Sequence, residues 1–398
     1  MAKTAQASIK IPLTGNDAGA YAMKQINPDV VAAYPITPQT ELMQTFAQYV
    51  HDGDVDTELI TVESEHSAMS ACVGSAAAGA RTMTATSANG FALMWEVLYI
   101  AASLRLPITM TVVNRALSGP INIHCDHSDT MGARDSGWIQ LYAENPQEAY
   151  DLLLIAMKAG ENHGVLLPAL VAYDGFIISH TMEVVETLSD EDVKKYVGPY
   201  NPSYALLLDK DPFTVGPLDF HDYYFEHKRQ QIEGMENAPA ALAAAAAEYE
   251  ALSGRHYGPV ETYRTEDADV IMVALGSTAG TARYAVDVMR EQGKAAGLMK
   301  LRHFRPFPHA EIAAALGNAK CVVVCDRVAS FGAFGSPTFG EVRSALYEVP
   351  ERPHVLNFIY GLGGRDTGPD LLEEAFDEGF RVAETGKIDR HVGYLGVR

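Results

Sequence analysis

Short apolar runs alternate with helical patterns along most of this chain. The first such runs cover residues 30–34, 59–62 and 108–113, and each is followed by a cluster of polar residues. Alternating strands and helices are typical of an α/β fold with a parallel sheet, in which the carboxyl ends of neighbouring strands point the same way. Ligands bind at that edge, so we expect the polar residues after these strands to share one crevice.

Composition narrows the class of protein. The 398 residues are 47% hydrophobic and 20% charged, which suits a soluble chain of two domains of ~100–200 residues each. A net charge of −21 argues against binding nucleic acid or an anionic membrane surface. Residues 1–17 lack the apolar core of a signal peptide, and no apolar run is long enough to cross a membrane. We therefore expect a cytoplasmic protein whose four cysteines are reduced core residues.

The pattern of elements changes twice along the chain. Strands and helices alternate to about residue 173, strands vanish over 188–257, and a second α/β pattern begins at 269. We predict an α/β domain over residues 1–200, an extended linker with helices that wraps a partner over 201–258, and a second α/β domain over 259–398.

Three helix predictions are specific enough to be checked. A helix is predicted from Pro38 to Val50, with Thr37 as its N-cap and Pro38 in the favoured first position. An apolar helix is predicted over residues 91–104. The third prediction concerns the linker, where Pro239 is expected to break the alanine-rich run at 238–247.

Thr37, Glu65 and Arg115 are the candidate site residues, because each follows one of the first strands. A hydroxyl, a carboxyl and a guanidinium together suit a small anion beside a heterocycle that needs a proton partner. Each residue also has an ordinary explanation. Thr37 could only cap its helix, Glu65 could be an exposed acid in a first helical turn, and Arg115 could pair with Glu63. The apolar neighbours of Glu65 favour its burial, and burial would raise the pKa of its carboxyl.

Other motifs are weaker. Residues 124–129 (HCDHSD) match no familiar metal-ligand spacing, so we predict no metal ligands in this chain. Residues 276–280 are expected to be a plain strand-to-helix turn, and the glycines at 361–364 lack the lysine of a P-loop.

Four ordered motifs carry a family resemblance that spacing alone does not supply. The chain resembles the alpha subunits of 2-oxoacid:ferredoxin oxidoreductases, and those of the pyruvate enzymes most closely. The resemblance covers nearly the whole chain, including a linker at 204–231 and the RPFP sequence at 305–308. The motifs are YPITP at 34–38, VESEHSA at 62–68, NRALS at 114–118 and RDSGWIQ at 134–140.

The resemblance implies a thiamine-diphosphate enzyme. Its first domain would be the pyrimidine-binding half of the cofactor site, and its second would be similar to the carboxy-terminal domain of transketolases. Glu65 would hydrogen-bond the aminopyrimidine ring nitrogen, and Pro35 would line the pyrimidine pocket. Ser87 and Asn89, in the turn after the next strand, would also lie against the cofactor.

The resemblance also assigns the substrate residues, because Thr37 and Arg115 would hold the substrate carboxylate. The chain departs from the family pattern at Asn89, where a glutamine is expected, and at His124-Cys125, which replaces a bulkier pair. Both changes lie near the expected pocket. They leave open a substrate other than pyruvate: 2-oxobutyrate, a branched-chain 2-oxoacid, 2-oxoglutarate or oxalate.

The implied reaction is the reversible conversion of pyruvate, coenzyme A and oxidised ferredoxin to acetyl-CoA, CO2 and reduced ferredoxin. The sequence contains no Gly-Asp-Gly and no cluster-binding cysteine pattern. The resemblance therefore places Mg²⁺, the diphosphate half of the site and [4Fe-4S] clusters on beta, gamma and delta subunits. A remaining alternative is a non-catalytic scaffold that only docks such partners.

Overall fold

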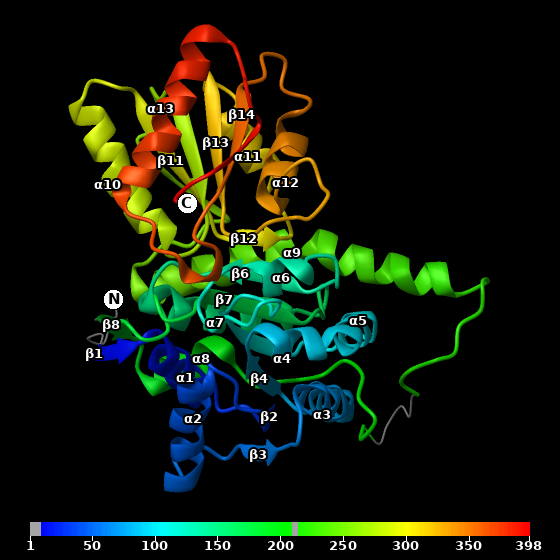
Figure 1. Cartoon of the computed structure of the whole chain (residues 1–398). Helices are drawn as coiled ribbons and strands as arrows, with labels where there is room; N and C mark the ends of the chain where they lie inside the picture. Colours follow the sequence, from blue (N-terminus) through cyan, green and yellow to red (C-terminus); the bar gives the residue numbers. More distant parts are fainter. Residues whose placement is uncertain (1–8, 209–213) are drawn as a thin grey trace, which may run out of the picture.

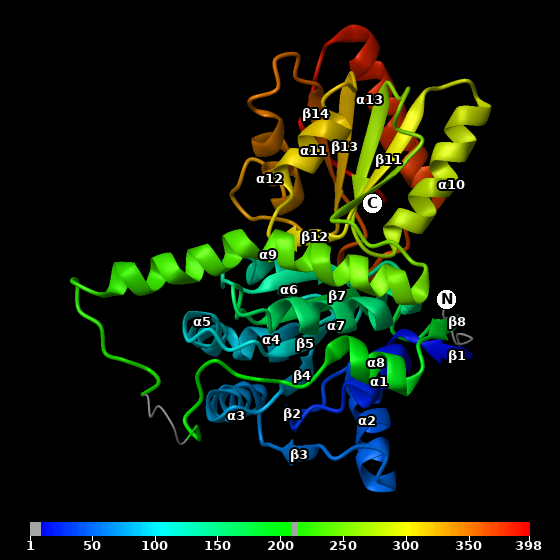
Figure 2. The same cartoon turned by 180° about the vertical axis from the view of Figure 1, so that it is seen from behind.

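The computed structural model describes residues 9–208 and 214–398. Part of the segment considered for a signal peptide and part of the 204–231 linker thus lie outside the described residues. Two α/β units lie one above the other, and the long helix α9 (Tyr224–Ser253) crosses their junction (Figure 1). Seen from behind, the start of α9 projects beyond the first unit (Figure 2). Within the described ranges, no helix is long and apolar enough to span a membrane.

The first unit contains a sheet of seven described strands in the order β12-β6-β7-β5-β4-β2-β3, in which only β12 runs antiparallel. Val31 and Ala33 of β2 pack with α1, α2 and α7, whereas Ala32 packs with α3 and α5 on the opposite face. Both faces are buried, so the strands read as continuous apolar runs. The bounds are β1 (Ile9–Thr14), α1 (Gly15–Ile26), β2 (Val30–Ala33), α2 (Thr40–Asp52), β3 (Glu58–Thr61), α3 (Glu65–Ala78), β4 (Thr82–Thr86), α4 (Ala88–Leu93), α5 (Trp95–Ser103), β5 (Thr109–Asn114), α6 (Ser128–Gly132), β6 (Ile139–Tyr142), α7 (Pro146–Gly160), β7 (Ala169–Asp174), β8 (Met182–Thr187) and α8 (Asp190–Val197).

The second unit contains a sheet of six described strands in the order β15-β14-β13-β10-β11-β9, parallel except for β9. Helices α10 and α13 cover one face, and α11 and α12 cover the other. The bounds are β9 (Val260–Tyr263), β10 (Val270–Ala274), α10 (Thr278–Glu291), β11 (Ala296–Leu301), β12 (His303–Arg305), α11 (His309–Leu316), β13 (Cys321–Asp326), α12 (Pro337–Leu346), β14 (His354–Ile359), η1 (Leu362–Gly364), α13 (Pro369–Thr385) and β15 (Val392–Tyr394).

The two units share a core and a strand. One cluster of buried apolar side chains contains Tyr142 of the first unit together with Ile271 and Phe304 from the second half of the chain. Strand β12 pairs antiparallel with β6 of the first sheet, with His303 opposite Leu141. The second unit is therefore joined to the first by backbone pairing as well as by side-chain packing.

Two of the helix predictions concern the first unit, and both were wrong in detail. Helix α2 begins at Thr40 and not at Pro38, because Gln39 closes a turn on Ile36: its N–H donates to the Ile36 carbonyl at 2.8 Å. Thr37 is therefore not the N-cap, and the helix amides do not begin there. The helix predicted over 91–104 is divided at Met94 into α4 and α5.

The third prediction was also wrong, because Pro239 does not break the alanine-rich run. Helix α9 continues through Pro239 to Ser253. Pro239 is exposed, whereas Ala238, Leu242 and Tyr249 are buried in the core that also contains α7. Packing along this face holds the helix despite the loss of one hydrogen-bond donor.

Candidate active site

The candidate residues follow four neighbouring strands of the first sheet. Thr37 comes after β2, Glu65 after β3, Ser87 after β4 and Arg115 after β5, and these strands are adjacent in the order β5-β4-β2-β3. All four strands are parallel, so the residues lie along one edge of the sheet. The common edge agrees with the expectation, and the crevice that these residues would share stays a prediction.

Glu65 is a buried acid whose side chain has no hydrogen-bond partner among the residues that the structure describes. It is the first residue of α3, which Ser64 caps by accepting from the Ser67 N–H, and its exposed fraction is only 7%. A Cβ on Gly90 would lie 2.5 Å from Oε1 of Glu65, so only a glycine allows the carboxyl this position. Within residues 9–208 and 214–398, no group donates to the Glu65 carboxylate or pairs with it. The predicted burial of Glu65 is confirmed.

Arg115 and Thr37 are linked directly. Nη1 of Arg115 donates to the Thr37 carbonyl at 2.9 Å, and Nε donates to the Asn122 carbonyl at 3.1 Å. Arg115 is 7% exposed and has no ion pair with Glu63, whose carboxylate accepts from Ser67. Among the described residues, neither Nη2 of Arg115 nor the exposed Thr37 hydroxyl has a hydrogen-bond partner. The guanidinium therefore keeps a donor, and it is held to the main chain of a residue whose hydroxyl is also available, an arrangement that suits a carboxylate.

The remaining predicted residues differ in burial. Ser87 is fully buried, and its hydroxyl donates to the Val113 carbonyl at 2.6 Å, so it holds β4 to β5. Asn89 is exposed, and its Oδ1 accepts from the N–H and hydroxyl of Ser118 at 3.1 and 2.8 Å. Pro35 is exposed in the loop after β2. Asn89 thus ties the turn after β4 to the loop that contains Arg115.

Asp129 is a residue of this edge that the sequence analysis missed as a site residue. It lies in α6 and is 2% exposed, and burial raises the pKa of its carboxyl to about 6 although backbone amides donate to it. Its Oδ2 accepts from the Ala88 and Arg115 N–H groups, each at 3.0 Å. The sequence signal was an acid within HCDHSD, which is too common a feature to single out.

His124 and Cys125 lie where the second unit meets this edge. The His124 ring packs on Phe176 with ring centroids 5.2 Å apart, and the Cys125 carbonyl accepts from the Gly364 N–H at 2.7 Å. Cys125 is buried, whereas His124 is exposed. The unusual pair is therefore a contact between the units as well as a neighbour of Arg115.

A buried ion cluster joins the carboxyl ends of strands from both units. Asp174, at the end of β7, contacts His127 Nε2 at 2.7 Å and Arg327 Nη1 at 3.0 Å, and it also accepts from Ser277. Burial would raise the pKa of Asp174, but His127 and Arg327 hold it well below its usual value. Cys125 lies beside this cluster, 3.9 Å from Nη1 of Arg327. Because Asp174 already has these partners, the cluster serves to join the units.

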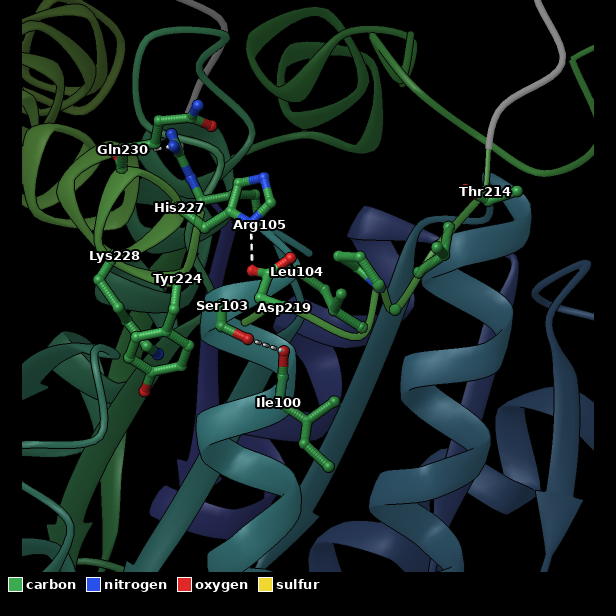
Figure 3. Close-up of a pocket in the computed structure, with 13 residues that line it drawn as sticks. Ile100, Ser103, Leu104, Arg105, Thr214, Asp219, Tyr224, His227, Lys228 and Gln230 are labelled. Atoms are coloured by element: carbon green, nitrogen blue, oxygen red, sulfur yellow. Dashed lines mark hydrogen bonds and ion pairs between the residues drawn. The ribbon is translucent and has the colours of Figure 1, made fainter. Parts of the chain in front are cut away.

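A separate cavity of about 540 Å³ lies between the end of α5 and the start of α9 (Figure 3). Arg105, His227 and Lys228 contribute to its wall, together with the segment at 214–217. As the structure describes it, none of the six predicted site residues lines this cavity. It is therefore not the site formed at the strand ends.

Comparison with protein families gives the class that this fold and site define. Residues 21–247 match the thiamine-diphosphate-binding domain of pyruvate flavodoxin/ferredoxin oxidoreductases. Residues 268–372 match core domain II of pyruvate:ferredoxin oxidoreductase. The first match alone covers more than half of the chain. The class is a thiamine-diphosphate-binding α/β protein with a second α/β unit.

The chain belongs to the pyruvate flavodoxin/ferredoxin oxidoreductase family, as its motifs indicated. It is 57% identical to pyruvate synthase subunit PorA of Thermotoga maritima and 45% identical to that of Pyrococcus furiosus, over 98% of each chain. It is 42% identical to ketoisovalerate oxidoreductase subunit VorA of Pyrococcus abyssi, also over 98% of each chain.

Solved structures agree on the fold. A 2-oxoglutarate:ferredoxin oxidoreductase from Magnetococcus marinus superposes with a TM-score of 0.71 at 21% identity, over 93% of this chain and 65% of that one. A split-gene transketolase superposes with a TM-score of 0.56 at 12% identity, over 93% of this chain and 99% of that one. The α/β fold predicted from the sequence is confirmed.

Proposed function

We propose that this chain is the pyrimidine-side subunit of a pyruvate:ferredoxin oxidoreductase, which reversibly converts pyruvate, coenzyme A and oxidised ferredoxin to acetyl-CoA, CO2 and reduced ferredoxin. The observation that carries the proposal is the buried Glu65 carboxylate without a partner in the described chain. A carboxylate without a partner among the described residues can accept from, or share a proton with, a polar group supplied from outside the chain. The 57% identical relative named pyruvate synthase supports pyruvate as the substrate.

The residues at the strand ends fit the pyrimidine end of thiamine diphosphate. Gly90 leaves room for the Glu65 carboxyl, and that carboxyl is free to share a proton with a ring nitrogen. Pro35, Ser87 and Asn89 would complete the pocket wall on this side. When bound, thiamine diphosphate supplies the carbanion chemistry that releases CO2 from a 2-oxoacid.

The substrate carboxylate would bind to Arg115 and Thr37. Nη2 of Arg115 and the Thr37 hydroxyl are free donors, and the hydrogen bond from Arg115 to the Thr37 carbonyl keeps them together. The folded chain already fixes this guanidinium, so the binding of an anion does not have to immobilise it. Orientation of the 2-oxoacid is therefore the role proposed for this pair.

The other components would come from other chains. We propose that a beta subunit supplies Mg²⁺, the diphosphate half of the site and an iron–sulfur cluster, and that gamma and delta subunits carry [4Fe-4S] clusters toward ferredoxin. Coenzyme A would be the acyl acceptor. Within this chain, residues 1–200 would be the pyrimidine domain, 201–258 a segment that wraps a partner, and 259–398 the transketolase-like domain.

A branched-chain 2-oxoacid is the second candidate substrate, because a ketoisovalerate oxidoreductase subunit is 42% identical over the same length. Initial rates of the purified complex with pyruvate, 2-oxobutyrate, 2-oxoisovalerate, 2-oxoglutarate and oxalate distinguish the candidates. We expect the highest kcat/KM with pyruvate. A higher value with 2-oxoisovalerate would assign the chain to the branched-chain acid.

The first prediction tests Glu65. In the assembled complex, Glu65→Gln keeps the size of the side chain but removes the acid, so pyruvate-dependent reduction of a viologen dye should fall by about 100-fold or more. Glu63→Gln is the matched control, since Glu63 is exposed and its carboxylate accepts from Ser67, and the rate of this variant should stay at the wild-type value.

The same complexes also test the scaffold alternative. Thiamine diphosphate is extracted from each variant and quantified by fluorescence after oxidation. Normal turnover of Glu65→Gln, with a full content of cofactor, would show that Glu65 has no catalytic role and would favour the scaffold alternative.

A further inference from the structure

The Asp129 carboxylate accepts four hydrogen bonds from N–H groups of the described residues. Oδ2 accepts from the Ala88 and Arg115 N–H groups at 3.0 Å each, and Oδ1 accepts from Asn114 Nδ2 at 2.7 Å and the Thr130 N–H at 2.8 Å. Asp129 is 2% exposed and Asn114 is fully buried. One carboxylate thus fastens the turn after β4, the end of β5 and the first turns of α6 together.

The two backbone amides on Oδ2 belong to the loops that form the candidate site. Ala88 has φ of 44°, a left-handed conformation that alanine rarely adopts and that needs external support. The Ala88 turn leads to Asn89 and to Gly90, which receives the Glu65 carboxyl. The Arg115 N–H fixes the main chain from which the guanidinium reaches the Thr37 carbonyl.

We propose that Asp129, as a carboxylate, is the positioning residue that holds the Ala88 turn and Arg115 in register with each other at this edge. Its effect on turnover rests on the proposed function, in which Arg115 binds the substrate. Asp129 itself does not touch the substrate and acts through the two loops.

The four N–H groups can all be accepted only if the Asp129 side chain is an ionised carboxylate. An ionised carboxylate only accepts hydrogen bonds, whereas a protonated acid or an amide must place a donor against at least one of the four donors. The Asn114 amide donates to Asp129, and the Tyr142 phenol, which donates to Thr130, and the Cys125 thiol interact with its charge. Burial raises the pKa of both the phenol and the thiol, so they stay neutral. The Arg115 guanidinium points away, toward the carbonyls of Thr37 and Asn122.

The test is Asp129→Asn in the assembled complex, with Asp326→Asn as the matched control. Asp326 is also a buried acid, at the end of β13, and it accepts from the Thr338 and Phe339 N–H groups and from Asn357 Nδ2, but it lies in the second unit. Amide exchange is measured by mass spectrometry on peptides that contain Ala88 and Arg115, and kcat and KM for pyruvate are measured on the same samples.

In Asp129→Asn we expect faster amide exchange at Ala88 and Arg115. We also expect KM for pyruvate to rise by about 10–100-fold, a change in affinity typical of the loss of a residue that orients a binding group. Asp326→Asn should change neither. The wild-type kcat/KM should fall as the pH drops through about 6, where Asp129 takes up a proton, and this acid limb should be absent from Asp129→Asn.

Unchanged exchange at both amides would overturn the proposal whatever the enzyme's activity. Changed exchange with an unchanged KM and a retained acid limb would overturn the catalytic link. A wild-type complex that turns over no 2-oxoacid would instead contradict the proposed function, while the exchange result would still decide whether Asp129 holds the two loops.

Discussion

At the scale of single residues, two charged side chains of the candidate site form no ion pair with each other or with another described residue. Glu65 is buried, and no group among the described residues donates to its carboxylate. The Arg115 guanidinium donates to the Thr37 main-chain carbonyl. Because no carboxylate in the described part of the chain forms an ion pair with Arg115, its charge remains available to a ligand. These two side chains therefore support the proposal that this edge of the sheet binds an anion beside a polar ring.

Arg115→Ala should mainly affect substrate binding. Removal of a charge-assisted contact typically costs about 1.5–3 kcal/mol, so KM for pyruvate should rise roughly 10–100-fold while kcat changes less. Steady-state kinetics of the complex measure both values, with the exposed Arg352→Ala as the control. A fall in kcat with an unchanged KM would contradict the role of Arg115 as a carboxylate clamp.

At the scale of elements, local patterns predicted most strands well and several helix boundaries poorly. Strands β2, β3 and β5 lie within one residue of the apolar runs at 30–34, 59–62 and 108–113, because a continuous apolar run is easily recognised. Helix α2 starts late because the Gln39 side chain and backbone close a turn that sequence preference does not reveal. Strands β6 and β12 were missed, since each is short and is defined by its pairing partner.

Pro239 offers a direct test of what holds α9. It is exposed inside the helix, where proline costs up to about 3 kcal/mol relative to alanine, so Pro239→Ala should stabilise the protein and raise Tm. The exposed neighbour Ala240→Gly should act in the opposite direction, by about 1 kcal/mol. Calorimetry of the complex compares the two, and a lower Tm for Pro239→Ala would show that the proline relieves a strain in the helix.

At the scale of the whole molecule, charged side chains fasten the two units together. Lys300 and Arg302 are each 1% exposed, and both contact Glu148 of α7, at 2.5 and 2.9 Å. Glu144, Glu261 and the less buried Arg283 also belong to this cluster. Burial would raise the pKa of Glu148, but Arg302 and Lys300 lower it below the usual value. The units are therefore held in one relative orientation by a compensated buried network.

Glu148→Gln should loosen this junction. It removes one of three acids facing two buried cations, so the free energy of unfolding should fall by about 2–3 kcal/mol. Neutralising the exposed pair by Arg264→Met should cost less than about 1 kcal/mol. Thermal or denaturant unfolding of the complex measures both changes, and equal effects of the two substitutions would contradict a structural role for the buried cluster.

The difference in the free energy of unfolding between the wild type and Glu148→Gln should depend on pH in one direction. An acid whose pKa is lowered by folding stabilises the protein above its unfolded pKa, and the stabilisation is lost as the pH falls through the folded value. The gap in stability between wild type and Glu148→Gln should therefore be full at neutral pH and shrink below about pH 4.

The sequence by itself determined the alternation of strands and helices, the two α/β units and the family, because apolar periodicity, turn residues and short motifs are local properties of the chain. Glu65, Thr37 and Arg115 could be picked out because they directly follow recognisable strands. Only the tertiary structure decided that Asp129 holds Ala88, 41 residues away, and that Glu148 contacts Arg302, 154 residues away. Hydrogen bonds across such separations depend on how the elements pack, and no local pattern records them.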